Sequence, residues 1–414
     1  MAQTGGDTEV RSSSLPIGWH WVTLGAVAKW GSGGTPSRSK EEYYGGDIPW
    51  IKTGELNDSI IFDTEEKLSA IGLKNSSAKM FPADSIAIAM YGATIGKLGI
   101  LGVEASCNQA CAVAIPLENL YNMYLFYYLK ASKEGLVKRG QGGAQPNISQ
   151  EIIKSFPIPV PPIDIQKRIA SALAEADALI QKRKEAIAKL DGLVESIFYE
   201  MFGDYRFNNK SWSVCELKDV ITDITAGWSV GGEERKKLPE EKAVLKISAV
   251  TSGIFNPSAY KVVKPENYLL KTLVHPMKGD ILFSRANTRE LVGATCMVDD
   301  DYDDLFLPDK LWKLKFLENC NPYYLLSVLQ NKWFREKLSS KATGTSGSML
   351  NISKEKFLEM PLYLPPRELQ DQYGDICFAI QNQKSLMENQ LAKLEENFQS
   401  LLHQAFTGQL QFRE

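Results

Sequence analysis

The sequence predicts an α+β protein built from two tandem, duplicated globular domains, each followed by a long helix. The first observation is a repeated passage: "NISQEIIKSFPIPVPPIDIQ" begins at Asn147, and "NISKEKFLEMPLYLPPRELQ" begins 204 residues later at Asn351. The second is the stretch from Ile163 to Met201, which contains no proline and a single glycine. The third is length, because 414 residues exceed the size at which one hydrophobic core usually stops growing.

A repeat this long indicates duplicated domains, since solenoid repeats have periods of about 20–50 residues. The second copy opens around Trp212 and Leu217, which match Trp19 and Leu24 of the first copy. The predicted organisation is a disordered tail over residues 1–14, a first globular domain over 15–160, a central helix over 161–204, a second globular domain over 205–363 and a C-terminal helix over 364–414.

Each globular domain is predicted to follow the same order of elements. Short apolar segments bounded by Gly, Pro and Asp indicate strands and turns. A Tyr-rich helical segment follows at residues 122–130 and 321–330. A polar loop then leads to a proline-rich edge, where proline ends a strand before the long helix begins.

The long helices carry an apolar stripe with alternating spacings of three and four residues, which is typical of a coiled-coil seam. At about 1.5 Å per residue, the first helix would be roughly 58 Å long. We expect the two helices to pair as an antiparallel coiled coil with pseudo-twofold symmetry, each stripe facing its copy. The predicted pairing residues are Ile187, Leu190, Val194, Ile197 and Met201 on the first helix and Leu391, Leu394, Phe398, Leu401 and Ala405 on the second.

Composition excludes several classes of protein. No run of about 18 apolar residues is present, so we expect no membrane span, and the N-terminal region lacks the apolar core of a secretory signal. Six scattered cysteines and three histidines show no metal-ligand spacing, which predicts reduced thiols, a cytoplasmic location and no bound metal. The net charge of −3 lacks the basic excess that is usual for nucleic-acid binders. DNA binding would therefore need a local basic face or the help of partner subunits.

Several polar loops nevertheless carry residue types that contact DNA. Gln can pair bidentately with adenine and Arg with guanine or phosphate, although the same residue types are common on solvated surface loops. The Gly-rich loop at residues 30–47 lacks the Gly-Lys-Ser/Thr ending of a phosphate-binding P-loop. The candidate DNA-binding residues are Thr35, Ser37, Arg38, Tyr43, Tyr44, Lys52, Tyr91, Lys97, Lys138, Arg139, Gln141, Gln145, Trp228, Arg235, Lys236, Arg285, Asn287, Arg289, Lys310, Thr345 and Ser346.

The sequence predicts no catalytic site. Asn321-Pro322-Tyr323-Tyr324 partly resembles the Asn-Pro-Pro-Tyr motif of amino-methyltransferases, which hold a flipped base. However, no Gly-rich loop for a methyl donor precedes it. The residue types favour a helix start, with Asn321 as the cap and Pro322 at the first helical position.

The ordered motifs resemble those of the specificity subunits of type I restriction-modification systems, over essentially residues 15–412. They are "GGTPS", "YYGGDIPWIKTGEL", "GATIGKLGI", "CNQA", the repeated Asn-Ile-Ser to Gln passage, and a closing "LLHQAFTGQL". The resemblance implies two target-recognition domains, each of which reads one part of a split site in double-stranded DNA. It also implies that the paired helices act as a ruler between the two half-sites.

The same resemblance implies a non-catalytic chain that recruits two methyltransferase subunits and, in the full complex, two restriction and motor subunits. S-adenosylmethionine, ATP and Mg²⁺ would be used by those partners, and this chain would bind no cofactor. The two domains differ strongly outside their shared edges, so we expect an asymmetric target. The alternatives are a modification-only or other phage-defence assembly, and a coiled-coil adaptor without DNA affinity.

Overall fold

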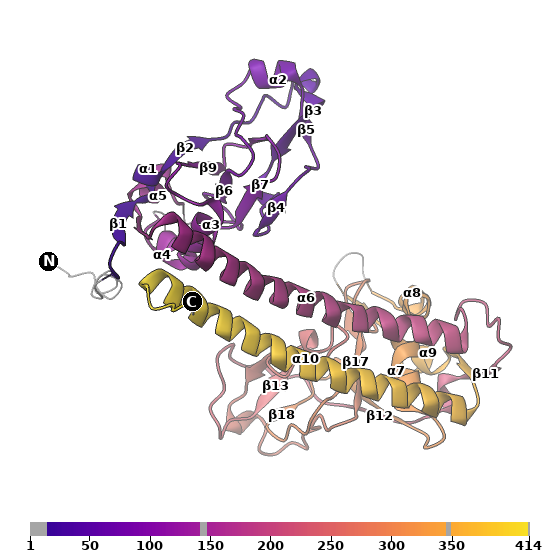
Figure 1. The fold of residues 1–414 in the computed structure, drawn as a ribbon. Helices are drawn as coiled ribbons and strands as arrows, with labels where there is room; N and C mark the ends of the chain where they lie inside the picture. Colours follow the sequence, from indigo (N-terminus) through magenta and orange to yellow (C-terminus); the bar gives the residue numbers. More distant parts are fainter. Residues whose placement is uncertain (1–14, 141–146, 345–348, 413–414) are drawn as a thin grey trace. The chain divides into compact units, whose positions relative to one another are not determined.

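The computed structural model describes residues 15–140, 147–344 and 349–412, and the tail predicted over residues 1–14 lies outside them. The chain divides into two compact units, which comprise residues 1–184 with 389–414 (unit 1) and residues 185–388 (unit 2). Each unit is therefore built from one globular domain and one half of each long helix (Figure 1). Within the described part of the chain, every helix is too short or too polar to cross a lipid bilayer.

Unit 1 begins and ends its globular domain with one pair of strands, which we call the neck. Strand β1 (His20–Thr23) pairs antiparallel with β10 (Pro157–Val160). The main sheet has the order β2-β9-β6-β7-β4, formed by β2 (Ala28–Ser32), β9 (Cys111–Pro116), β6 (Ile86–Ala89), β7 (Leu98–Leu101) and β4 (Ser59–Ile61). A small sheet has the order β5-β3-β8, formed by β5 (Lys67–Leu68), β3 (Tyr44–Ile51) and β8 (Ser106–Cys107).

Unit 2 repeats this plan. Its neck pairs β11 (Ser213–Glu216) with β21 (Pro361–Leu364). The main sheet has the order β12-β19-β15-β17, formed by β12 (Ile221–Ala226), β19 (Leu311–Phe316), β15 (Ile281–Ser284) and β17 (Thr295–Met297). The small sheets are β14-β13-β18, formed by β14 (Tyr260–Val262), β13 (Ala243–Leu245) and β18 (Leu305–Phe306), and the pair β16 (Ala286–Asn287) and β20 (Leu350–Asn351).

The short helices of unit 1 are α1 (Leu24–Val27), α2 (Ala70–Lys74), α3 (Asn122–Ala131), α4 (Lys133–Lys138) and α5 (Gln150–Ser155). Those of unit 2 are α7 (Pro322–Gln330), α8 (Lys332–Lys341) and α9 (Lys354–Leu358). Three short helices of unit 1, α3, α4 and α5, have counterparts in unit 2, namely α7, α8 and α9. Single 3-10 turns lie at Glu41–Tyr43, Thr53–Glu55, Leu217–Asp219, Ile247–Ala249 and Pro265–Asn267.

The repeated Asn-Ile-Ser passage has a structural role in both domains. Ile148 and Ile352 are buried in the two cores. Ser149 caps α5 and Ser353 caps α9, each by accepting a hydrogen bond from a backbone N–H of the first turn. A serine at this position satisfies one of the N–H groups that a helix start leaves unpaired. The polar loop therefore ends in an apolar anchor and a helix cap.

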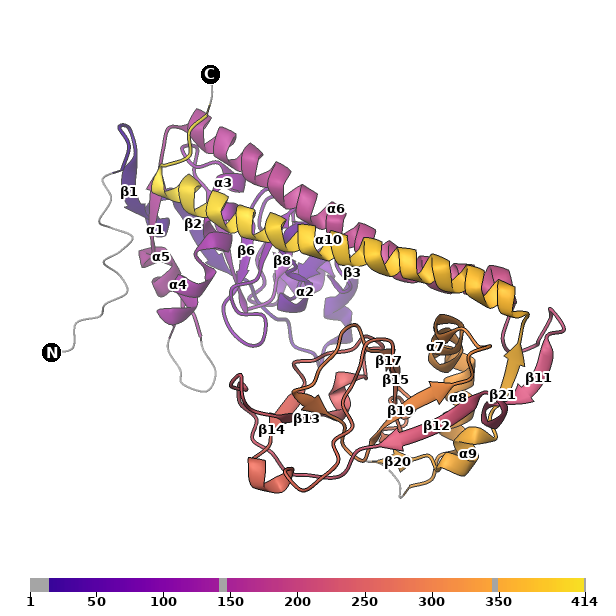
Figure 2. The ribbon, with the colours of Figure 1, turned by 90° about the horizontal axis from the view of Figure 1, so that it is seen from below.

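Two long helices follow the necks, α6 (Ile163–Phe202) and α10 (Arg367–Thr407). Each ends at a glycine with positive φ, Gly203 and Gly408, a conformation that stops a helix at little cost. Figures 1 and 2 show the two helices side by side. Lys184 pairs with Glu395 at 2.8 Å and Lys384 pairs with Asp191 at 2.7 Å. Partner numbers fall along α10 as they rise along α6, so the pairing is antiparallel, as predicted.

The partners of the two apolar stripes differ from the sequence-based expectation, which paired each stripe with its copy. The stripe Leu391, Leu394, Phe398, Leu401 and Ala405 packs in the core of unit 1, against the first half of α6 and against α3. Val194, Ile197 and Met201 pack in the core of unit 2, while Ile187 and Leu190 are half-buried. The reason is direction: in an antiparallel pair, the second half of one helix meets the first half of the other.

Aromatic side chains complete each core at a helix end. In unit 1, Phe406 of α10 lies 5.3 Å from the ring of Tyr124 in α3. In unit 2, Phe202 of α6 lies 4.7 Å from the ring of Tyr324 in α7. Each long helix thus starts at the neck of one domain and ends in the core of the other.

A pair of glycines allows the main and small sheets of each domain to meet. A Cβ on Gly33 would lie 2.1 Å from the Cys107 carbonyl oxygen, and one on Gly227 would lie 1.6 Å from that of Leu307. Both glycines come directly after the first strand of the main sheet. Only the absence of a side chain permits such a close approach of two backbones.

We predict that Gly227→Ala destabilises unit 2 by about 1–3 kcal/mol or more, because backbone must shift to admit the methyl group. Hydrogen exchange at the amides of β12 and β18 measures the change locally, which suits a chain with two units. Gly231→Ala is the matched control, since no atom lies within 4 Å of a Cβ there. Equal protection in the two variants would contradict the prediction.

Candidate nucleic-acid interface

In unit 1, the Gly-rich loop is held against the small sheet by aromatic side chains. The indole Nε1 of Trp50 donates to the Gly34 carbonyl at 3.0 Å, and the Tyr44 hydroxyl donates to the Pro36 carbonyl at 2.6 Å. The Thr35 hydroxyl is hydrogen-bonded to the Gln109 side chain. The loop is therefore fixed at several points.

Arg38 stacks on this aromatic pair and is also paired with an acid. Its guanidinium lies 4.6 Å from the Tyr44 ring centroid and 5.1 Å from that of Trp50. It forms an ion pair with Glu66 at 2.6 Å, and Lys52 reaches the same carboxylate at 3.0 Å. Hydrogen bonds from Arg38 and then Lys52 hold the pKa of Glu66 below its usual range. Arg38 and Lys52 thus share the Glu66 carboxylate, and Lys52 also pairs with Glu65 at 2.9 Å.

Three further candidates of unit 1 are Ser37, Tyr43 and Tyr91. Ser37 is exposed and lies within hydrogen-bond distance of Ser39, and Tyr43 is half-buried with Lys40 over its ring. Tyr91 is 37% exposed and forms a β-bridge with Asn147, which places the 90–97 loop beside the Asn-Ile-Ser passage.

The end of α4 adds further polar side chains. Lys138, its last residue, is exposed, and Arg139, which follows it, lies 4.7 Å over the Phe156 ring. Gln141 and Gln145 fall outside the described residues, as do Thr345 and Ser346 in the matching loop of unit 2.

In unit 2, Arg285 is tied into the domain. Its guanidinium pairs with Asp309 at 3.1 Å and also donates to the Asp309 carbonyl. Asn287 lies in β16 and accepts a hydrogen bond from the backbone N–H of Thr288. Arg289, at the tip of the same loop, is exposed.

The remaining candidates of unit 2 lie around β12 and the small sheet. Trp228 stacks on Phe306 with ring centroids 5.8 Å apart. Arg235 pairs with Glu233 and Glu241, at 3.0 and 2.6 Å. Its exposed neighbour Lys236 has no such pair within the described residues.

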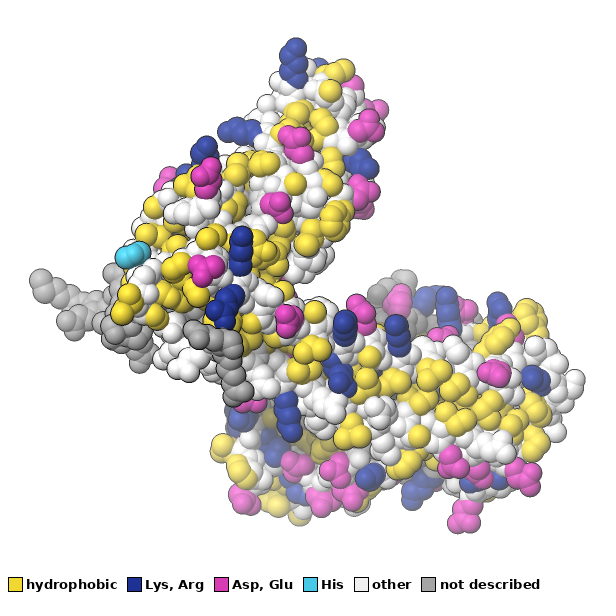
Figure 3. Space-filling view, in the orientation of Figure 1, with side chains coloured by type: hydrophobic (Ala, Val, Ile, Leu, Met, Phe, Trp, Pro, Cys, Tyr) yellow, Lys and Arg dark blue, Asp and Glu magenta, His cyan; other side chains and the backbone are white. Residues whose placement is uncertain are grey.

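The candidate cations thus fall into two groups. Arg38, Lys52, Arg235 and Arg285 are ion-paired inside their own domains. Over residues 15–140, 147–344 and 349–412, no ion pair is formed by the side chains of Lys97, Lys138, Lys236, Arg289 and Lys310. Figure 3 shows basic and acidic side chains interspersed on the face in view, which agrees with this local neutralisation.

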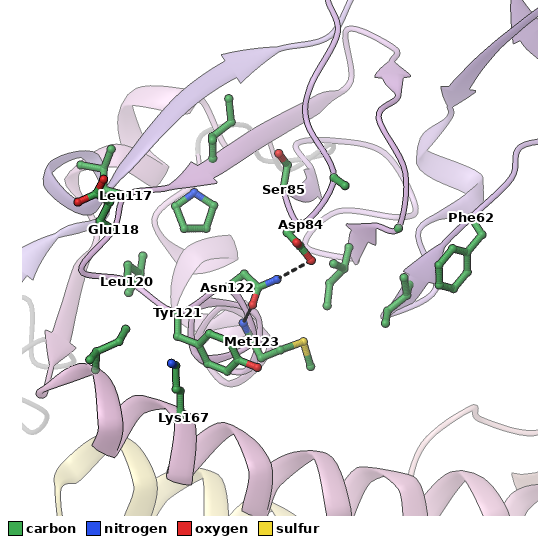
Figure 4. Close-up of a pocket in the computed structure, with 17 residues that line it drawn as sticks. Phe62, Asp84, Ser85, Leu117, Glu118, Leu120, Tyr121, Asn122, Met123 and Lys167 are labelled. Atoms are coloured by element: carbon green, nitrogen blue, oxygen red, sulfur yellow. Dashed lines mark hydrogen bonds between the residues drawn. The ribbon is translucent and has the colours of Figure 1, made fainter.

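Unit 1 also has a cavity of about 780 Å³ beside its joint, by which we mean the neck together with the first turn of the long helix. Figure 4 shows Tyr121, Asn122, Met123 and Lys167 around it. The amide of Asn122 donates to Asp84 at 3.1 Å. Among the described residues, no group of three or more His, Cys, Asp or Glu side chains is placed to hold a metal ion.

Sequence reasoning missed two features of these domains. It selected the cations but not the carboxylates that neutralise them, because Glu66 and Asp309 lie far from their partners in sequence. It also noted that Gln166 and Gln370 match, without recognising that both are buried. The signal available in the sequence was a glutamine that recurs 204 residues later, at the same place in both copies.

The structure confirms Asn321 as a helix cap. Its side chain accepts a hydrogen bond from the backbone N–H of Tyr323, and Pro322 occupies the first position of α7.

Comparison with known proteins gives consistent results. The family model described as "Type I restriction modification DNA specificity domain" matches residues 16–190 and again residues 209–396. The EcoR124I/EcoR124II specificity subunit of Escherichia coli is 31% identical over 194 residues, which span 45% of this chain and about half (48%) of that protein. The MjaVIII specificity subunit of Methanocaldococcus jannaschii is 24% identical over 98% of this chain and 96% of that protein.

Two solved structures share the fold. The type I restriction-modification S subunit from M. genitalium aligns with a TM-score of 0.56 and 16% identity, over 96% of this chain and 97% of that one. A chain from a structure of complex assembly in the type I R-M system aligns with a TM-score of 0.59 and 18% identity, over 96% of this chain and 100% of that one. With its two matches to the family model and an architecture of two domains and two long helices, the chain belongs to the family of type I restriction-modification DNA specificity subunits.

Proposed function

We propose that this chain, a non-catalytic specificity subunit, recognises an asymmetric bipartite site in double-stranded DNA, with one half-site read by each domain. The observation that carries the proposal is the duplication itself. The necks, helix caps and joints recur in both domains, whereas the candidate loops do not. Unit 1 presents Arg38 stacked on Tyr44 and Trp50, while unit 2 presents Trp228 stacked on Phe306. Because different side chains occupy the loops that follow the first strand of each main sheet, we expect the two domains to read different half-sites.

The unpaired cations are the proposed phosphate contacts. Backbone contacts position a protein on DNA, and base-edge contacts specify sequence. Lys138 and Arg289 suit the first role because both are exposed, Lys138 at the last position of α4 and Arg289 in the loop that follows β16. The remaining neutralisation of phosphates is assigned to partner subunits, since this chain has a net charge of −3.

The proposed partners are two methyltransferase subunits and, in the restriction complex, two restriction and motor subunits. S-adenosylmethionine, ATP and Mg²⁺ are assigned to those partners and not to this chain. A cytoplasmic location is proposed because the cellular DNA and these partners are there. The paired helices α6 and α10 are proposed to set the number of base pairs between the half-sites.

Selection from a pool of random duplexes tests the proposal, with the full chain in complex with its methyltransferase partner. We expect enrichment of one site with two different half-sites and a fixed number of unspecified base pairs between them. Enrichment of a continuous or symmetric site would contradict the asymmetric assignment. No enrichment over a pool treated with the methyltransferase alone would support an adaptor without DNA affinity.

We predict that Glu66→Gln strengthens sequence-independent DNA binding at low salt, because it releases Arg38 for a phosphate contact, whereas Lys52 keeps its pair with Glu65. Each added contact steepens the slope of log Kobs against log salt concentration by about 0.9. One released cation therefore gives an expected change of about one in the magnitude of that slope.

Glu41→Gln is the matched control for this prediction. It changes the net charge by the same amount, but Glu41 is exposed and forms no ion pair in the described part of the chain. Filter binding over a salt series measures both slopes. Equal slopes for the two variants would show that the Glu66 ion pair does not withhold Arg38 from DNA.

A further inference from the structure

Two glutamines are buried at the joints. Gln166 is 0% exposed and Gln370 is 1% exposed, and each lies in the first turns of a long helix. Full burial of glutamine is uncommon, because an amide removed from water must find hydrogen-bond partners within the protein. The hydrogen-bond partners of these two side chains identify the segments that each glutamine links.

In unit 1, the Gln166 amide links three segments. Its Oε1 accepts from the backbone N–H of Tyr121, immediately before α3, at 2.8 Å. Its Nε2 donates to the carbonyls of Asn119 and Pro161, both at 2.9 Å. One side chain of α6 therefore holds the loop that enters α3 and the diproline that leaves the neck.

Unit 2 repeats two of these three contacts among the described residues. The Oε1 of Gln370 accepts from the backbone N–H of Asn321, before α7, at 3.0 Å, and its Nε2 donates to the Pro365 carbonyl at 2.8 Å. A tyrosine hydroxyl adds to each joint: Tyr124 donates to the Pro159 carbonyl and Tyr324 to the Tyr363 carbonyl, both at 2.6 Å.

These hydrogen bonds do more than fill space. A leucine or methionine would fit a cavity of similar size without the cost of burying an amide. Directional hydrogen bonds instead fix the angle at which the helix leaves the domain, since they weaken steeply when donor and acceptor are misaligned. Both copies have a buried glutamine with these hydrogen bonds, although the residues around it differ.

The two joints have different surroundings. In unit 2, Arg367 pairs with Asp371 at 2.7 Å, and Asp371 accepts from the Asn321 amide at 2.8 Å. In unit 1, the cavity of Figure 4 lies beside the joint, and Ile163 and Lys167 are among the residues that line it. Within the described residues, Gln166 itself forms three hydrogen bonds and Gln370 forms two.

We propose that Gln166 and Gln370 are positioning residues that fix each recognition domain on its helix, and that they thereby determine which spacing between half-sites the complex accepts. This inference rests on the proposed function. Because Gln166 forms three of these hydrogen bonds and Gln370 forms two among the described residues, loss of Gln166 has the larger effect on spacing.

The test uses the full chain in complex with its methyltransferase partner. Binding is measured to a series of duplexes with the selected half-sites and with the spacer unchanged, one base pair shorter or one longer. We expect Gln166→Met, which keeps side-chain volume, to reduce the preference for the selected spacer at least about threefold. We expect a smaller reduction for Gln370→Met, with both half-sites still recognised.

Leu136→Ala is the control for loss of stability alone. Leu136 is a fully buried residue of α4 in the same core, and it does not form the hydrogen bonds of the joint. This variant should lower the amount of active complex and leave the ratio between spacers unchanged. If Gln166→Met folds poorly, Gln166→Glu replaces it, since it keeps an acceptor for Tyr121 and removes the donor to Asn119 and Pro161.

A wild-type spacer ratio in a folded Gln166 variant would overturn the inference and leave the proposed function standing. The same loss of preference in Leu136→Ala would also overturn it, because the effect would then belong to stability. Failure of the wild-type complex to prefer any spacer would overturn the proposed function itself.

Discussion

The packing of each long helix into the core of the domain that it does not follow in sequence is the interaction on which the rest of the structure depends. Phe406 of α10 is 8% exposed beside Tyr124 and Tyr128, and Phe202 of α6 is 3% exposed beside Tyr324. Burying a phenylalanine contributes about 1.5–3 kcal/mol. Because of this exchange, neither domain has a complete core without the helix of the other half of the chain.

The same exchange explains why the duplicated features are internal and the differing ones are external. In each unit the buried glutamine links the end of the neck to a long helix, and the isoleucine of the Asn-Ile-Ser passage packs in the same core, so a change there would disturb that core. Arg38 packs on Tyr44 and Trp50, Trp228 packs on Phe306, and the Arg289 carbonyl accepts from Ser339, so each of these loops is held by its own domain. A conserved frame with variable loops is a common way to place different binding specificities on one scaffold.

Much of the fold could be predicted from the sequence. The repeat and the period of the apolar stripes predicted two domains, two long helices and their antiparallel direction. The partners of the stripes could not be predicted, because periodicity shows which face of a helix is buried and not what covers it. Phe398 and Val194 fit a coiled-coil seam in sequence, yet each packs largely against a globular domain.

The candidate interface was less predictable for a related reason. Residue type identified Arg38, Lys52 and Arg285 as possible DNA contacts, but their availability depends on carboxylates brought close only by folding. Glu66 is 28 residues from Arg38 in sequence and forms a hydrogen bond with it at 2.6 Å. The burial of Gln166 could likewise not be predicted, because the loop before α3 and the diproline lie beside α6 only in the folded chain.

The proposed function makes each globular domain the reader of one half-site, attached to the long helices through an equivalent joint. The most direct measurement is the site selected by a chain in which residues 20–160 replace residues 213–364, so that both necks carry the first domain. The proposed function predicts a symmetric site, with the first half-site present twice in inverted orientation and an unchanged spacer. A folded complex that still selected the original asymmetric site, or that selected neither half-site, would contradict it.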